Sequence, residues 1–279
     1  MSCEFEWDDE VDVVCTDSGV GGLATAISAV DEDGEVFIAE LPPPGYRAPG
    51  RPQRSWFSVP GDAGTLEYLR ELTSDIDVAA LTQADADLPV RRAGEPVPAR
   101  RRPIPPYEGW RLREWAATCI PSPTGYLYTQ VTDWRSPTVD CGDGNLLKIA
   151  EIGSMTPDPS RPIGSVREWL IAEAHERDLT PEPVTHFDGL VFDEGVVVGA
   201  VFTTDRGPMT IRARHGVLIC RNTPDAGQSA TVRSPDGTAL TVALVGKEAS
   251  RFGRVELLTE DGAVADVAGR PGELTASKS

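Results

Sequence analysis

The first forty residues contain two short apolar runs separated by a longer segment of small and apolar residues. Residues 11–15 are Val-Asp-Val-Val-Cys, a β-branched run that is typical of a buried parallel strand. Residues 23–30 are rich in small side chains, which let a helix lie close to a sheet. Residues 35–40 predict a second strand, which ends in an acid. This order predicts a strand–helix–strand unit of the kind that binds nucleotides.

The turn between the first strand and the helix has the composition of a dinucleotide site. Its glycines let the backbone approach a pyrophosphate, and the start of the helix offers free N–H groups and a partial positive charge. Glu40 follows about twenty residues later, where an acid can accept a hydrogen bond from a ribose hydroxyl. The candidate cofactor-binding residues of this unit are Ser18, Gly19, Val20, Gly21, Gly22 and Glu40.

The first position of the usual G-x-G-x-x-G pattern is Asp17 instead of glycine. An aspartate adds a Cβ to a tight turn and a negative charge beside the pyrophosphate. Two like charges about 4 Å apart cost on the order of 1–4 kcal/mol, which is roughly one to three decades of affinity. Asp17 therefore opposes dinucleotide binding, and both a weakened and a lost cofactor site remain open.

The second half of the chain continues the alternation of helix and strand. An amphipathic helix is expected at residues 163–177. Strands are expected at residues 184–192, 196–202, 209–213 and 217–220. The pattern predicts an α/β fold whose nucleotide-binding body consists of residues 1–50 and 150–222. Residues 51–149 are then an insertion, and residues 223–279 are a small C-terminal addition with a hairpin formed by residues 254–258 and 264–267.

Three stretches, residues 7–26, 61–73 and 196–219, resemble the fumarate reductase/succinate dehydrogenase flavoprotein family, most closely its 3-ketosteroid dehydrogenase branch. The first contains Ser-Gly-Val-Gly-Gly-Leu-Ala-Thr-Ala, and the last contains Val-Val-Gly-Ala-Val-Phe and Ile-Arg-Ala-Arg-His-Gly-Val-Leu-Ile. The resemblance implies a Rossmann-like FAD/NAD(P)-binding fold, FAD as the cofactor and oxidoreductase chemistry. It also implies that the backbone of Phe187 faces the adenine.

The chain departs from this family at several points. Residues 219–222 are Ile-Cys-Arg-Asn where the family has Ala-Thr-Gly-Gly, and a proline run at residues 42–44 replaces a glycine-rich loop. The family's late segment, which closes the flavin site, has no counterpart here, and no catalytic residue can be transferred. Two hypotheses follow. One is a degenerate FAD-binding oxidoreductase-like protein, either by itself or as a subunit whose protein partner completes the flavin site. The other is a non-catalytic pseudoenzyme scaffold that binds a protein partner or a small apolar ligand.

Charge and composition argue against several classes of function and of binding site. The 26 basic and 44 acidic residues give a net charge of −18, which argues against nucleic-acid binding. There is no apolar run long enough to span a membrane and no secretory signal, so a cytoplasmic protein is expected. Five scattered cysteines and three histidines without ligand spacing predict neither a disulfide framework nor a metal site.

The predicted insertion contains two unusual compositions. Residues 89–124 are rich in proline and arginine, which predicts an irregular surface loop, with an anion-binding patch at residues 100–102 as the alternative. Six aromatic residues follow one another closely, and they either anchor the insertion, which we favour, or line an apolar ligand pocket. These residues are Tyr107, Trp110, Trp115, Tyr126, Tyr128 and Trp134.

Overall fold

The computed structural model describes residues 6–42, 62–78, 81, 88–97, 109–131, 136–140, 146–220 and 237–268. Its helices are α1 (Val20–Asp31), α2 (Ala63–Leu72), α3 (Gly109–Cys119), α4 (Pro162–Glu176) and α5 (Gly262–Ala268). Its first strands are β1 (Asp9–Cys15), β2 (Val36–Glu40), β3 (Val90–Arg92), β4 (Glu95–Val97), β5 (Gly125–Tyr128), β6 (Thr138–Asp140) and β7 (Leu146–Met155). The later strands are β8 (Glu182–Pro183), β9 (His186–Asp193), β10 (Val196–Thr204), β11 (Gly207–Cys220), β12 (Leu240–Gly246) and β13 (Phe252–Thr259).

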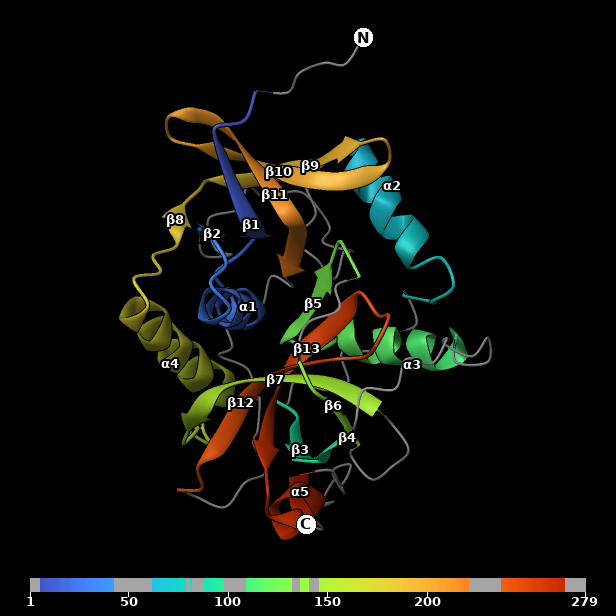
Figure 1. Cartoon of the computed structure of the whole chain (residues 1–279), viewed down its shortest axis with the longest axis vertical. Coiled ribbons are helices and arrows are strands. Elements are labelled where there is room, and N and C mark those ends of the chain that lie inside the picture. The colour runs from blue at the N-terminus through green and yellow to red at the C-terminus, as the bar shows by residue number, and fades with distance from the viewer. Residues whose placement is uncertain are drawn as a thin grey trace, which may run out of the picture.

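The described strands form one mixed sheet in the order β4-β6-β7-β12-β13-β5-β11-β1-β2-β8 (Figure 1). In addition, β10 pairs with β11 and β9, and β3 pairs with β13. The predicted α/β class is confirmed by this sheet and its helices. The boundaries of body, insertion and addition stay a prediction, although strands from all three segments pair within the same sheet.

The predicted strand–helix–strand unit is β1, α1 and β2. Val13, Val14 and Cys15 pair in parallel with residues 36–38 of β2, and β1 pairs in parallel with β11 on its other edge. Nine of the twelve residues of α1 are buried, since its small side chains allow close packing on the sheet. The local pattern therefore determined this unit correctly.

The other half of the sheet is mostly antiparallel. Strand β12 pairs with β7 and β13, and β5 joins the two halves because it pairs antiparallel with both β13 and β11. The sequence prediction of a hairpin between residues 254–258 and 264–267 was wrong. Residues 262–268 form α5, and β13 takes β12 as its hairpin partner. The expected irregular loop at residues 89–124 was also wrong in part, because it contains β3, β4 and α3.

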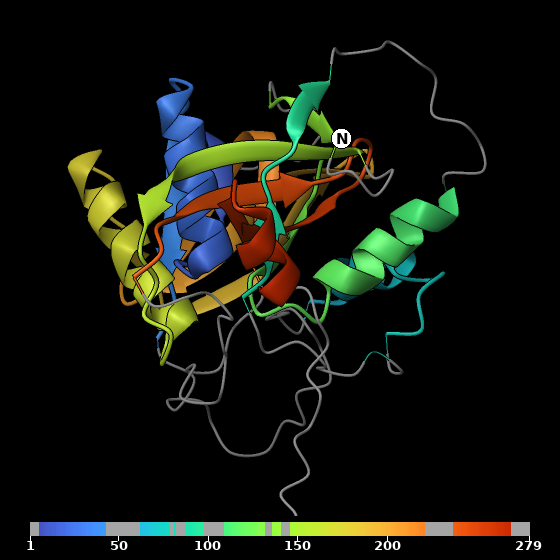
Figure 2. The same cartoon turned by 90° about the horizontal axis from the view of Figure 1, so that it is seen from below.

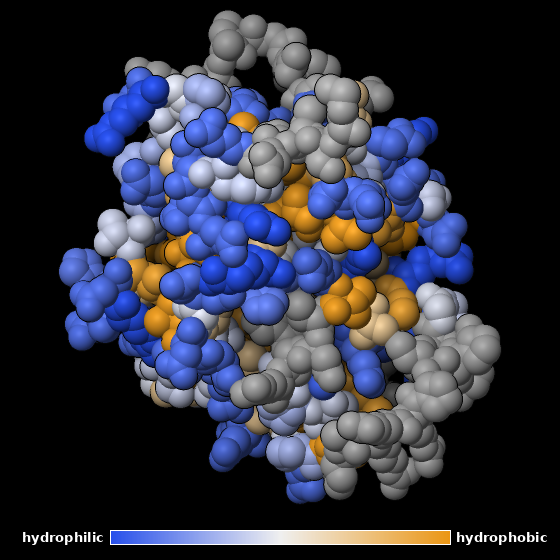
Figure 3. Space-filling model, turned by 45° about the horizontal axis from the view of Figure 1, so that its top comes forward, coloured by the Kyte–Doolittle hydropathy of each residue, from blue (hydrophilic) through white to orange (hydrophobic). Residues whose placement is uncertain are grey.

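Helices cover both faces of the sheet (Figure 2). Helices α1 and α4 lie side by side on one face, where Leu23 and Leu170 are fully buried. Helix α3 packs on the opposite face against β13 through Trp115. The face shown in Figure 3 is mainly hydrophilic, with a few groups of apolar residues between the polar ones.

Beneath α3, the sheet contains a buried ion network. Glu256 is fully buried, and it accepts hydrogen bonds from Arg91 Nε at 2.7 Å and Arg254 Nε at 2.7 Å. Trp115 stacks on the Arg254 guanidinium and donates its indole N–H to the carbonyl oxygen of Phe252 at 2.8 Å. Burial opposes ionisation of Glu256, but the two arginines hold the pKa of its carboxyl below the ordinary value. The network ties β3 to β13 and α3.

Replacing Glu256 by Gln should destabilise the fold by about 3–5 kcal/mol, because two largely buried guanidinium groups lose their counter-charge. Urea unfolding at neutral pH measures this change. Glu67→Gln is the matched control, since Glu67 pairs with Arg70 on the exposed surface of α2 and should cost less than about 1 kcal/mol. A small effect of Glu256→Gln would show that the network contributes little.

The same carboxylate should make stability depend on pH. Because the pKa of Glu256 is lower in the folded chain, its stabilisation is complete above the ordinary glutamate value of 4.5 and is lost as the pH falls through the lower folded value. The difference in unfolding free energy between the wild type and Glu256→Gln should therefore shrink in acid. A difference that stays constant as the pH falls would contradict this assignment.

Candidate functional site

The predicted diphosphate site lies at the carboxyl end of β1, where the chain turns into α1. Gly19 is the N-cap residue of α1 and has no side-chain cap. The turn is tight, since a Cβ on Gly22 would lie 2.0 Å from the carbonyl oxygen of Asp17. Gly22 therefore provides the close approach of helix and strand that the third glycine of the pattern supplies. The backbone geometry expected from the sequence is present here.

The first turn of α1 nevertheless packs against side chains from β5 and α4. The ring of Tyr126 lies against Gly21, where an added Cβ would be 3.3 Å from Tyr126 Cδ1 and 3.8 Å from the carbonyl oxygen of Thr124. Ser18 is buried, and Arg167 Nη2 donates to its hydroxyl at 3.4 Å. Val20 is also buried. These contacts pack the first turn of α1 against β5 and α4.

Asp17 lies on the same turn. Its Oδ1 is 2.9 Å from the position of a Cβ on Gly19, so the carboxylate sits beside the glycine that should let a pyrophosphate approach. A negative charge at this point opposes a second anion there. The sequence prediction of a charge conflict at Asp17 thus has a geometric basis in the turn.

The thiol of Cys220 also lies at the start of α1. A Cβ on Gly22 would be 3.2 Å from Cys220 Sγ, and this thiol donates to the carbonyl oxygen of Asp17 at 3.6 Å. Burial raises the pKa of Cys220 well above its ordinary value, so the thiol stays neutral. Cys220 is therefore an uncharged packing residue at the point where the resembling family has small residues.

The two remaining predicted cofactor-binding residues, Glu40 and Phe187, lie on β2 and β9. Glu40 is exposed at the end of β2, two residues beyond Ile38, which pairs with Cys15 of β1. Its carbonyl oxygen accepts a hydrogen bond from the backbone N–H of Val184 at 3.0 Å. Phe187 is buried in β9 and packs on Phe202 with ring centroids 5.5 Å apart. Glu40 therefore lies exposed at the carboxyl end of β2, where the sequence pattern places it, and its contact with a ribose stays a prediction.

Several residues of interest lie outside the described part of the chain. They are residues 43–50, Arg100–Arg102, Tyr107, Trp134 and the pair Arg221 and Asn222. Within the described residues, no cluster of three or more His, Cys, Asp or Glu side chains is arranged to hold a metal ion. None of the helices described combines the length and apolar character needed to cross a bilayer.

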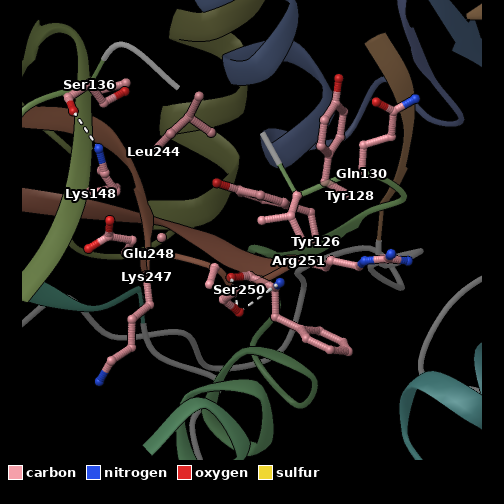
Figure 4. Close-up of a pocket in the computed structure, with 15 residues that line it drawn as sticks. Tyr126, Tyr128, Gln130, Ser136, Lys148, Leu244, Lys247, Glu248, Ser250 and Arg251 are labelled. Atoms are coloured by element: carbon pink, nitrogen blue, oxygen red, sulfur yellow. Dashed lines mark hydrogen bonds between the residues drawn. The ribbon is translucent and has the colours of Figure 1, made fainter. Parts of the chain in front are cut away.

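A cavity that the sequence did not reveal lies beside the predicted site, with Tyr126 between the two (Figure 4). Its volume is about 250 Å³, and strands β5, β7, β12 and β13 contribute to its walls. Lys148, Lys247 and Arg251 line it together with Tyr126 and Tyr128. The aromatic cluster was the available signal: Tyr126 and Tyr128 are buried anchors and also line this cavity.

Comparisons with known proteins return FAD-dependent oxidoreductases of solved structure. A 3-ketosteroid-Δ4-(5α)-dehydrogenase from Rhodococcus jostii RHA1 matches 77% of this chain at 18% identity and a TM-score of 0.32. A flavocytochrome c3 fumarate reductase matches 74% at 12% identity and a TM-score of 0.29. An anhydrotetracycline hydroxylase from Streptomyces rimosus matches 74% at 15% identity and a TM-score of 0.27.

These similarities do not assign the chain to a family. The chain spans 46%, 33% and 30% of the three solved chains, which is less than half of each. No family model matches the sequence, and no curated protein sequence matches it either. The function must therefore be inferred from the residues of this chain.

The tight turn at the start of α1 can be tested by adding one methyl group. Gly22→Ala should destabilise the fold by about 1–3 kcal/mol, because its Cβ would overlap the backbone oxygen of Asp17. Gly246→Ala is the matched control, since a Cβ there meets no atom within 4 Å. Thermal or urea unfolding measures both variants. Equal stability of the two would contradict the close packing of α1 on the turn.

Proposed function

We propose that this chain is a non-catalytic protein of Rossmann-like flavoprotein architecture whose dinucleotide site is closed by its own residues. One observation carries the proposal. The ring of Tyr126 packs on Gly21 at the start of α1, where a diphosphate would need to bind the backbone N–H groups. Asp17 supports it, because its carboxylate lies beside Gly19. On this proposal the protein acts by binding a small molecule or a protein partner.

The second candidate is a FAD-binding oxidoreductase-like subunit with a weakened site. The exposed position of Glu40 at the end of β2 and the uncapped N-terminus of α1 favour it. Ser18, Gly19, Val20, Gly21, Gly22 and Glu40 would then hold the ADP half of FAD, with Phe187 near the adenine. The bound flavin would supply the redox chemistry. A partner chain would complete the site on this reading.

The visible spectrum of the purified protein separates the two candidates. After incubation with excess FAD and desalting, the wild type should show no flavin bands near ~370 and ~450 nm. Asp17→Gly alone should not restore binding, because Tyr126 still packs on Gly21. For a merely weakened site, Asp17→Gly should instead raise FAD affinity by roughly ten- to a thousandfold.

Asp205→Gly, at the exposed turn between β10 and β11, is the control for the loss of one negative charge elsewhere. Wild-type protein that keeps one FAD per chain would overturn the proposal of a closed site. An increase in FAD affinity with Asp17→Gly, but not with Asp205→Gly, would support the second candidate instead.

A further inference from the structure

One row of paired residues crosses four strands below the cavity. Lys148 of β7 pairs with Gly246 of β12, which pairs with Gly253 of β13, which in turn pairs with Tyr126 of β5. Residues paired directly across strands point to the same face of a sheet. Lys148 and Tyr126 therefore face the same side, about 14 Å apart at their Cα atoms by the ordinary strand spacing. Only two glycines lie between them in this row.

The two glycines create the hollow for different reasons. A Cβ on Gly253 would lie 2.5 Å from the hydroxyl oxygen of Tyr126, so the phenol ring lies directly over this glycine. A Cβ on Gly246 would meet no atom within 4 Å, so the space above it is open. Because glycine has no side chain, the space above Gly246 stays unoccupied between the end of the Tyr126 ring and Lys148.

The hydroxyl of Tyr126 faces this open space. Tyr126 is only 8% exposed, yet within the described part of the chain its hydroxyl has no hydrogen-bond partner. Figure 4 shows the phenol pointing into the cavity, on the side of Lys148, whereas the neighbouring Tyr128 points away and donates to the carbonyl oxygen of His215 at 2.7 Å. Burial raises the pKa of Tyr126, so the phenol remains protonated and can donate a hydrogen bond.

Positive charge gathers around the same cavity. The ammonium group of Lys148 lines the cavity and donates to the carbonyl oxygen of Ser136 at 3.4 Å. Among the described residues that line the cavity, Lys247 and Arg251 are further cations, and Glu248 is the one acid. The chain has three lysines and a net charge of −18, so two lysines in one cavity are a local reversal of charge. Such a reversal attracts anions.

The remaining walls are apolar. Leu244, Val131, Phe252 and the ring of Tyr128 line the cavity beside the polar groups. Its volume of about 250 Å³ lies just below the range of roughly 300–1,000 Å³ that holds drug-sized ligands. The cavity therefore suits a small molecule with one charged end and one apolar end.

We propose that this cavity binds a small organic anion, a monocarboxylate with a ring-sized apolar body. The carboxylate accepts hydrogen bonds from the Lys148 ammonium and the Tyr126 hydroxyl, and the apolar body lies over Gly246 against Leu244. The proposed ligand makes no contact with the turn before α1, although the ring of Tyr126 borders both that turn and the cavity. The proposal therefore does not rest on FAD binding.

Calorimetric titration of the full chain with benzoate and phenylacetate tests the proposal, with benzamide and phenylacetamide as uncharged probes of the same shape. Both acids should bind, and each should bind at least about tenfold more tightly than its amide. Lys148→Met should weaken acid binding by about 10- to 100-fold and leave amide binding unchanged. Tyr126→Phe should weaken it by a few-fold, since one hydrogen bond is lost.

Gly246→Val should abolish binding of acids and amides alike without loss of thermal stability, because its side chain would fill this unoccupied space. Arg206→Met, at the exposed β10–β11 turn, is the control for removal of a distant cation and should leave binding unchanged. The proposal is overturned if neither acid binds saturably at millimolar concentration, or if acids and amides bind equally. Wild-type affinity in both Lys148→Met and a folded Gly246→Val would also overturn it.

Discussion

The pairing of β5 with the end of β11 is the interaction on which the rest of this structure depends. Tyr126, Leu127 and Tyr128 pair antiparallel with residues 218–220. The other edge of β5 pairs with β13, so this short strand fuses the parallel half of the sheet to the antiparallel half. All four of its residues are buried, as expected for a strand covered on both faces.

This pairing also determines what happens at the start of α1. Because Tyr126 is opposite Cys220, its side chain shares a face with the thiol and reaches the first turn of the helix. A helix N-terminus in an open α/β sheet is normally available to a ligand at the carboxyl ends of the strands. Here a neutral aromatic ring and a neutral thiol pack there, next to the carboxylate of Asp17. The same ring forms one end of the neighbouring cavity.

On the opposite face of the sheet, the charged side chains are buried and paired with one another. Glu256 is buried with Arg91 and Arg254 beneath α3, where the three groups satisfy one another. The cations of the cavity are instead half-buried and lie beside an open space. The first arrangement is therefore suited to holding elements together, and the second is suited to receiving a ligand. The distinction rests on geometry, since Lys148, like Glu256, lies on a strand among apolar residues.

The sequence by itself determined the local elements and the chemistry of the first turn. Short-range patterns were sufficient for β1, α1, β2, α4 and β9, since period and turn residues act within about twenty positions. Asp17 could be recognised from the sequence for the same reason, because it replaces a glycine within a pattern of only six residues. The strand β12 and the helices α3 and α5 were missed, because proline-rich composition and a turn-like Asp-Gly pair gave misleading local signals.

Only the tertiary structure decided what surrounds the predicted site. The row from Lys148 to Tyr126 joins four strands through three separate registers, and a shift by one residue in any of them would turn its side chains to the other face. The strand and turn preferences of single residues carry no information about such registers. Taken one at a time, Gly246 and Gly253 resemble ordinary turn residues. Local sequence patterns therefore predicted the strand–helix–strand unit, and long-range strand pairing decided that Tyr126 packs on it and that a cavity opens beside it.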